Sequence, residues 1–179
     1  MTTRWYLVKL LLLCSAVGLM LCALQVGAAE EKSGARMVNH GFSFGGLGVR
    51  ENVGIEIMNF QYGASKAEGT YVDDASLTAG RVRQGGIVMG GMPVGDFLYV
   101  KWRILATGEV LEDSVDLKSL LPSDMDHKII HFVLNGRQLI VYLIEGTTSL
   151  HAPAAPDCPA ASYGPSRCTR IYPDHWSNF

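Results

Sequence analysis

The chain has 179 residues, a formal net charge of −2 and 48% hydrophobic residues. This length predicts one domain with room for a buried core. The mild acidity argues against nucleic acid or an anionic membrane surface as the main partner.

The first thirty residues have the order of a secretory signal. Arg4 and Lys9 precede an uncharged, mostly apolar run at 10–24, and small residues follow up to Ala29. As a helix this run would span about 22 Å, short of the roughly 30 Å hydrocarbon core of a bilayer. We therefore expect a cleaved signal over 1–29 and export from the cytoplasm.

Two cysteines inside this segment leave a lipoprotein interpretation open. Cys14 and Cys22 each follow a leucine, where lipoprotein signals carry a small residue. Membrane association is therefore expected only if one of them is lipidated or the signal stays uncleaved. The rest of the chain divides into a β domain over 30–150 and a Pro/Ala-rich tail over 151–179.

Short apolar runs separated by glycine-bearing turns predict a mainly β body. The first strand is expected over 53–62 and a second over 81–89, followed by Gly-Gly-Met-Pro at 90–93, which should break the ladder or mark an edge. A third strand, 97–105, alternates regularly. Its predicted inward face consists of Leu98, Val100, Trp102 and Ile104.

The next segment, 109–117, is a less regular strand in which Asp113 interrupts an apolar face. Its acidic cluster is expected either to be a solvated edge that resists aggregation or to meet a basic partner. This cluster consists of Glu109, Glu112, Asp113 and Asp116. One helical turn is expected over 117–122.

A hairpin is predicted where two apolar runs, 129–134 and 138–144, bracket Asn135-Gly136. This dipeptide tolerates the positive backbone angles of a type I′ turn. Because both arms are apolar at nearly every position, we expect the hairpin in the middle of a sheet, covered on both faces.

The tail contains Cys158 and Cys168, which are expected to form one disulfide that closes a short surface loop. A last short strand is expected over 169–172. The predicted fold is a single-domain β-sandwich of seven or eight mostly antiparallel strands with an irregular, disulfide-tied tail.

Residues 41–45 spell G-x-S-x-G, the signature of serine esterases and lipases, around Ser43. The signature works where the serine sits on a tight turn from a strand into a helix. Four glycines in the next eleven positions argue against such a helix. Asp174 and His175 would complete a triad order but lie in the tail, so we expect a strand-end serine and no catalytic residue.

No metal or cofactor is expected. His127 and His131 are four apart and flank a predicted apolar strand, where that spacing separates the Cα atoms by about 13 Å. Asp124-Met125-Asp126 lacks the remaining ligands of a calcium loop. The other histidines have no partner at ligand spacing and are expected on the surface or in loops: His40, His151 and His175.

The order of several short segments resembles a family of small bacterial envelope proteins found beside type VI secretion phospholipase effectors. The resemblance covers roughly residues 53–173. The segments are 85–93, 98–103, 107–109, 115–117, 121–122 and 139–144. It implies a periplasmic immunity protein that binds and neutralises a cognate toxic lipase, and it supplies no catalytic residue. Many relatives carry a lipoprotein cysteine, and this chain lacks a convincing one.

An inhibitor of this kind needs a rigid scaffold and a few well-packed anchors. The candidate contacts are Phe42, Phe44, Arg50, Tyr71, Glu112, Asp113, Tyr163, Arg167 and Trp176. The opposing interpretation is that most of them cover the core or the disulfide loop. Two other functions stay open: an envelope module that binds a lipid, glycan or peptide in a pocket between the sheets, and a lipolytic enzyme that uses Ser43.

Overall fold

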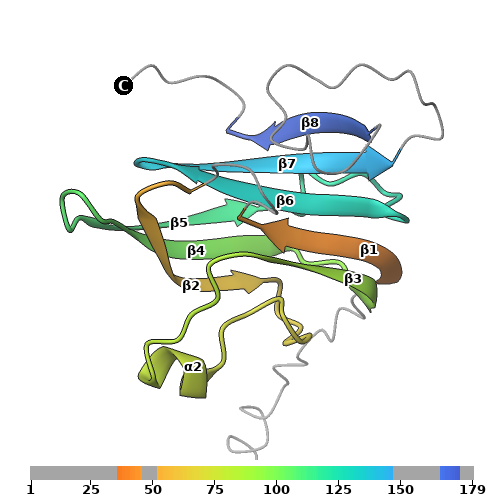
Figure 1. Ribbon diagram of the computed structural model, residues 1–179. Helices are drawn as coiled ribbons and strands as arrows, with labels where there is room; N and C mark the ends of the chain where they lie inside the picture. The colour runs from red at the N-terminus through yellow and green to blue at the C-terminus, as the bar shows by residue number, and fades with distance from the viewer. Residues whose placement is uncertain (1–35, 46–51, 147–165, 174–179) are drawn as a thin grey trace, which may run out of the picture. The chain divides into compact units, whose positions relative to one another are not determined.

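The computed structural model describes residues 36–45, 52–146 and 166–173 (Figure 1). The chain divides into two units, Met1–Gly34 and Ala35–Phe179, and every described residue belongs to the second. The expected signal segment therefore lies outside the described residues. Within the described ranges, no helix is long and apolar enough to cross a membrane.

The described residues form eight strands and one short helix, which confirms the mainly β prediction. The elements are β1 (Met37–Phe44), β2 (Ile55–Tyr62), α2 (Asp74–Thr78), β3 (Gly86–Pro93), β4 (Phe97–Ile104), β5 (Val110–Asp116), β6 (Lys128–Asn135), β7 (Gln138–Gly146) and β8 (Ser166–Tyr172). One sheet has the order β3-β1-β6-β7-β8 and the other β2-β4-β5. Among these strands only β1 and β6 pair in parallel.

Aromatic rings from both sheets share one core. The ring centroids of Phe44 on β1 and Phe60 on β2 lie 4.4 Å apart, and Phe44 stacks on Phe132 of β6 at 5.1 Å. Phe42 stacks on Tyr62 of β2 at 4.9 Å. Phe42 and Phe44 are 0% and 1% exposed, which corrects the expectation that they are exposed partner contacts. They face inward because positions 40, 42 and 44 share one side of β1.

The alternation predicted for β4 is confirmed. Leu98, Val100 and Trp102 are buried in the core, and Ile104 is half-buried. The Trp102 indole donates a hydrogen bond of 3.0 Å to the carbonyl oxygen of Gly136. This bond joins the middle of the three-stranded sheet to the hairpin of the five-stranded sheet.

The predicted hairpin is β6–β7, which occupies interior positions of its sheet and is buried on most residues. The turn type differs from the prediction. Asn135 pairs with Gln138, so Gly136 and Arg137 are the central residues. Gly136 has φ +58 while Arg137 is not among the residues with positive φ. This pattern fits a type II′ turn, which has glycine at its first central position.

Several boundaries also differ from the prediction. Residues 81–85 are not a strand, and β3 instead continues through Gly90 and Gly91 to Pro93. Because β3 is an edge strand, Pro93 is tolerated there, as the edge interpretation expected. The short helix α2 was missed. It begins after Asp73, whose carboxylate accepts a 2.8 Å hydrogen bond from the amide of Ser76.

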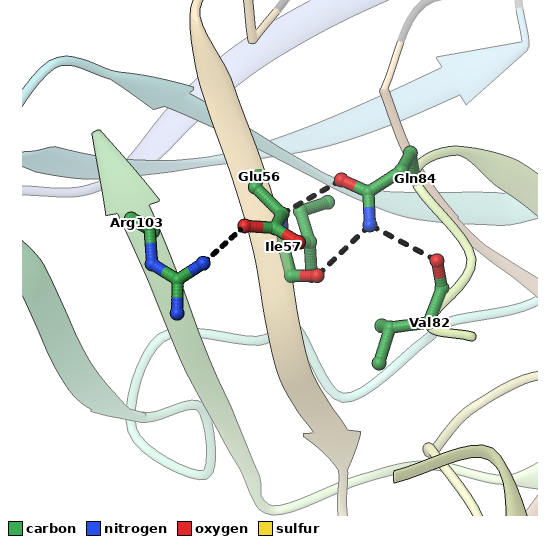
Figure 2. Close-up of polar contacts among 5 residues, drawn as sticks. All are labelled: Glu56, Ile57, Val82, Gln84 and Arg103. Carbon is green, nitrogen blue, oxygen red and sulfur yellow. Dashed lines mark hydrogen bonds and ion pairs between the residues drawn. The ribbon is translucent and has the colours of Figure 1, made fainter. Parts of the chain in front are cut away.

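The free edge of β2 is closed by side chains and loop backbone, as Figure 2 shows for Gln84. The Ile57 amide donates to Gln84 Oε1 at 2.7 Å, and Gln84 Nε2 donates to the Ile57 carbonyl at 2.9 Å. Gln84 Nε2 also lies 3.0 Å from the carbonyl of Val82. The Gln84 amide thus takes the place of a neighbouring strand, which shields an edge that would otherwise invite pairing with another chain.

Candidate functional site

Ser43 and His131 form a buried polar pair. They are register partners on β1 and β6, and Ser43 Oγ lies 2.8 Å from His131 Nδ1. Each is 1% exposed. Because neighbouring side chains alternate, both lie on the face of the five-stranded sheet opposite the aromatic core. A second apolar cluster shares this face: Ile129, Ile140, Tyr142, Ile144 and Cys168.

The contact is one that a serine hydrolase uses, since an imidazole can take the hydroxyl proton. The surroundings differ from those of a nucleophile elbow. Ser43 has the extended backbone of β1, and the first positive φ comes two residues later at Gly45. An elbow instead exposes its serine on the turn itself. With 1% exposure, the Ser43 hydroxyl has no room for an acyl substrate, so the geometry fits a satisfied polar pair within the sheet.

The sequence pointed to other histidines. His175, the proposed triad member, lies outside the described residues, and His131 was considered only as a metal ligand with His127. His127 is exposed, and its Nε2 lies 3.4 Å from Oδ2 of Asp126. Among the described residues no three potential ligands come together to hold a metal ion.

His40 is a second buried histidine, which corrects its expected surface position. Its Nδ1 donates to the carbonyl of Val38 at 3.0 Å, and the Tyr62 hydroxyl donates to its Nε2 at 3.0 Å. Burial, with a smaller contribution from Arg36, lowers the pKa of His40. Burial also raises the pKa of Tyr62. The alternation of His40 with Phe42 and Phe44 was the available signal for this position.

Much of the acidic cluster on β5 is engaged within the chain. Glu112 accepts a 2.9 Å hydrogen bond from Tyr99 and pairs with Lys101 at 3.4 Å. These contacts, the Tyr99 hydroxyl first, lower the pKa of Glu112. Asp113 accepts a 2.9 Å hydrogen bond from Tyr172 of β8, across the two sheets. Since β5 is an edge strand, the structure supports the solvated-edge interpretation.

The remaining predicted site residues are scattered or not described. Tyr71 is half-buried, and its backbone forms an isolated antiparallel β-bridge with Gln61. Arg167 pairs with Glu145 through the backbone, and its side chain is not described. Cys168 is buried and disulfide-bonded. Its predicted partner is not described, so that pairing stays a prediction. Outside the described residues lie Arg50, Cys158, Tyr163 and Trp176.

Three exposed apolar residues lie at one end of the three-stranded sheet, and we call them the corner patch: Val53, Leu105 and Val110. They are 73%, 59% and 45% exposed. The Leu105 amide donates to the carbonyl of Gly54 at 2.8 Å, which places the β4–β5 turn beside the turn that precedes β2. This patch was not predicted from the sequence, although the uncharged run at 104–108 was a signal for it.

Two ion pairs border the corner patch. Arg103, the register partner of Val110, donates to Glu56 at 2.9 Å (Figure 2). Arg137 pairs with Glu109, the residue before Val110. Among the described residues, these two pairs balance charges next to the patch within the chain.

Comparison with known proteins gives no relative for this chain. No family model, curated protein or solved structure matches it.

Proposed function

We propose that this chain is a non-enzymatic binding protein of the bacterial envelope, an immunity protein that inhibits a cognate secreted lipase or phospholipase. The resemblance of residues 53–173 to such proteins supports the choice of partner. The observation that carries the proposal is the corner patch, an exposed apolar surface on a well-packed scaffold. Export to the periplasm after removal of residues 1–29 is part of the same proposal.

The test uses the exported chain and the lipase or phospholipase encoded beside its gene. We expect the two to co-purify and the chain to block hydrolysis of phospholipid vesicles at a one-to-one ratio. The control is an unrelated lipase, which should keep its activity. If the two proteins neither bind nor show inhibition at micromolar concentration, the proposal is overturned.

A second candidate function is hydrolysis by the chain itself. The 2.8 Å contact between Ser43 and His131 favours it. Under this hypothesis the purified chain hydrolyses a p-nitrophenyl ester, and Ser43→Ala abolishes the activity while the protein stays folded. The burial of Ser43 and His131 weighs against hydrolysis by the chain, so we expect no activity above background.

A further inference from the structure

We propose that residues 147–165 dock on the outer face of the five-stranded sheet, the face opposite the aromatic core, and are fixed there by a disulfide between Cys158 and Cys168. This inference is independent of the proposed function. It assigns a surface and its occupant within one chain, and it removes this face from the surfaces on which a partner protein could bind.

The outer face is buried, although every described residue of its apolar cluster belongs to the sheet itself. Ser43 and His131 are each 1% exposed, and Ile144 is 2% exposed. The described members of the cluster come from β3, β6, β7 and β8. Because a sheet face that nothing covers is solvated, this burial requires a segment outside the described residues.

Five described residues on this face make further contacts whose partners lie outside the described residues: Ser43, His131, Tyr142, Cys168 and Arg170. Four of them form a row across the sheet. Ser43 on β1 is the register partner of His131 on β6, which is the partner of Tyr142 on β7. Tyr142 in turn pairs with Arg170 on β8. Since residues in register point to the same face, the occupant crosses the sheet from β8 to β1.

The disulfide of Cys168 identifies the occupant. Cys168 is disulfide-bonded and belongs to the outer-face cluster, so its partner cysteine lies over this face as well. The other cysteines of the chain are Cys14, Cys22 and Cys158. The first two belong to the separate unit Met1–Gly34, whereas Cys158 belongs to the same compact unit as β7 and β8. A disulfide keeps the two Cα atoms within about 7 Å, so the residues around Cys158 are held against β8.

Residues 147–165 have the position and the length to cross this face. They connect Gly146 to Ser166, which are register partners at one end of β7 and β8, whereas a hairpin needs only about two to five residues. Residues 147–157 span up to about 36 Å when extended. Strand β1 lies two strand spacings, roughly 10 Å, from β7. The segment can therefore reach Ser43 and return to Cys158.

The composition of residues 147–165 suits this role. They consist largely of alanine and proline, which lose no rotamer freedom when they are buried. Their one acidic residue, Asp157, precedes Cys158. Because Cys158 is tied to Cys168, the Asp157 carboxylate comes to the side of β8 that also carries Arg170, so opposite charges meet there.

The test measures modification of histidines by diethyl pyrocarbonate in the full chain. His131 on the outer face, His40 in the core between the sheets and the exposed His127 lie on separate tryptic peptides. In the wild type we expect His127 to be modified and the other two to be protected. When Asn-Gly, a hairpin turn, replaces residues 147–165, His131 should be modified at least about tenfold faster while His40 stays protected.

The two buried histidines make the outcome decisive. If His40 stays protected and His131 is as slow as in the wild type, the assignment is overturned. If His40 is modified as well, the replacement has unfolded the domain, and the intact chain decides. There the photocrosslinker p-benzoylphenylalanine replaces Leu150, and we expect crosslinks to the peptide 129–137 of β6 or 37–50 of β1. Crosslinks to neither peptide would overturn the assignment.

Peptide mapping of the full chain without reduction separates the possible occupants. A bond between Cys158 and Cys168 within one chain supports the proposal. A bond from Cys168 to Cys14 or Cys22 would give this face to the first unit, and a Cys168–Cys168 bond between two chains would give it to a second copy. Either of these results would overturn the assignment.

Discussion

The Ser43 hydroxyl lies 2.8 Å from Nδ1 of His131, although the two residues are 88 positions apart in the chain. The contact crosses the parallel pair β1–β6 and is buried at both ends. A motif typical of esterases therefore becomes, in this fold, a polar link between two strands of one sheet.

Replacement of this serine tests the structural role. Ser43→Ala removes the hydrogen bond to His131 in a buried setting, so we expect the free energy of unfolding to fall by about 1–3 kcal/mol in urea titrations. Ser114→Ala, at an exposed position of β5, should stay within about 0.5 kcal/mol of the wild type. Equal stability of all three proteins would contradict this role.

Gly95 is expected to be intolerant of a side chain. A Cβ at this position would lie 2.6 Å from Cε2 of Tyr62 and 2.9 Å from the Gly63 amide nitrogen. Gly95→Ala should therefore cost roughly 1–3 kcal/mol, as overpacking of a core does. Gly91→Ala is the matched control, because nothing lies within 4 Å of its added Cβ. Thermal unfolding midpoints compare the two, and a similar midpoint for both would refute the packing argument.

His40 should make stability depend on pH. Its folded-state pKa lies below the ordinary value of 6.5 because of burial, so protonation favours the unfolded chain. Stability is thus complete above about pH 6.5 and is lost as the pH falls through the folded-state pKa. Urea titrations between pH 7.5 and 5.5 should show a smaller loss for His40→Gln than for the wild type. Superimposable pH profiles would mean that His40 is not responsible.

Gln84 should protect the backbone of Ile57. Gln84→Ala removes the acceptor of the Ile57 amide, so we expect faster hydrogen exchange at that amide and a loss of about 1 kcal/mol in stability. Gln84→Glu keeps an acceptor for the Ile57 amide but places a carboxylate oxygen against the carbonyls of Ile57 and Val82, so we expect it to lose protection as well. Unchanged exchange at Ile57 in Gln84→Ala would show that the loop closes this edge without its side chain.

Local patterns in the sequence were sufficient for several elements. The alternation at 97–104 determined the inward face of β4, and two apolar runs around a glycine turn determined the β6–β7 hairpin and its interior position. These predictions succeeded because side-chain alternation and turn formation depend on residues close together in the chain.

Only the tertiary structure decided which strands meet. The parallel pairing of β1 with β6 brings Ser43 to His131, and the facing sheets bring His40 to Tyr62. The placement of Gln84 against β2 depends equally on distant segments. Strand order arises from the packing of the whole chain, and an apolar pattern along one strand does not specify the neighbour with which that strand pairs.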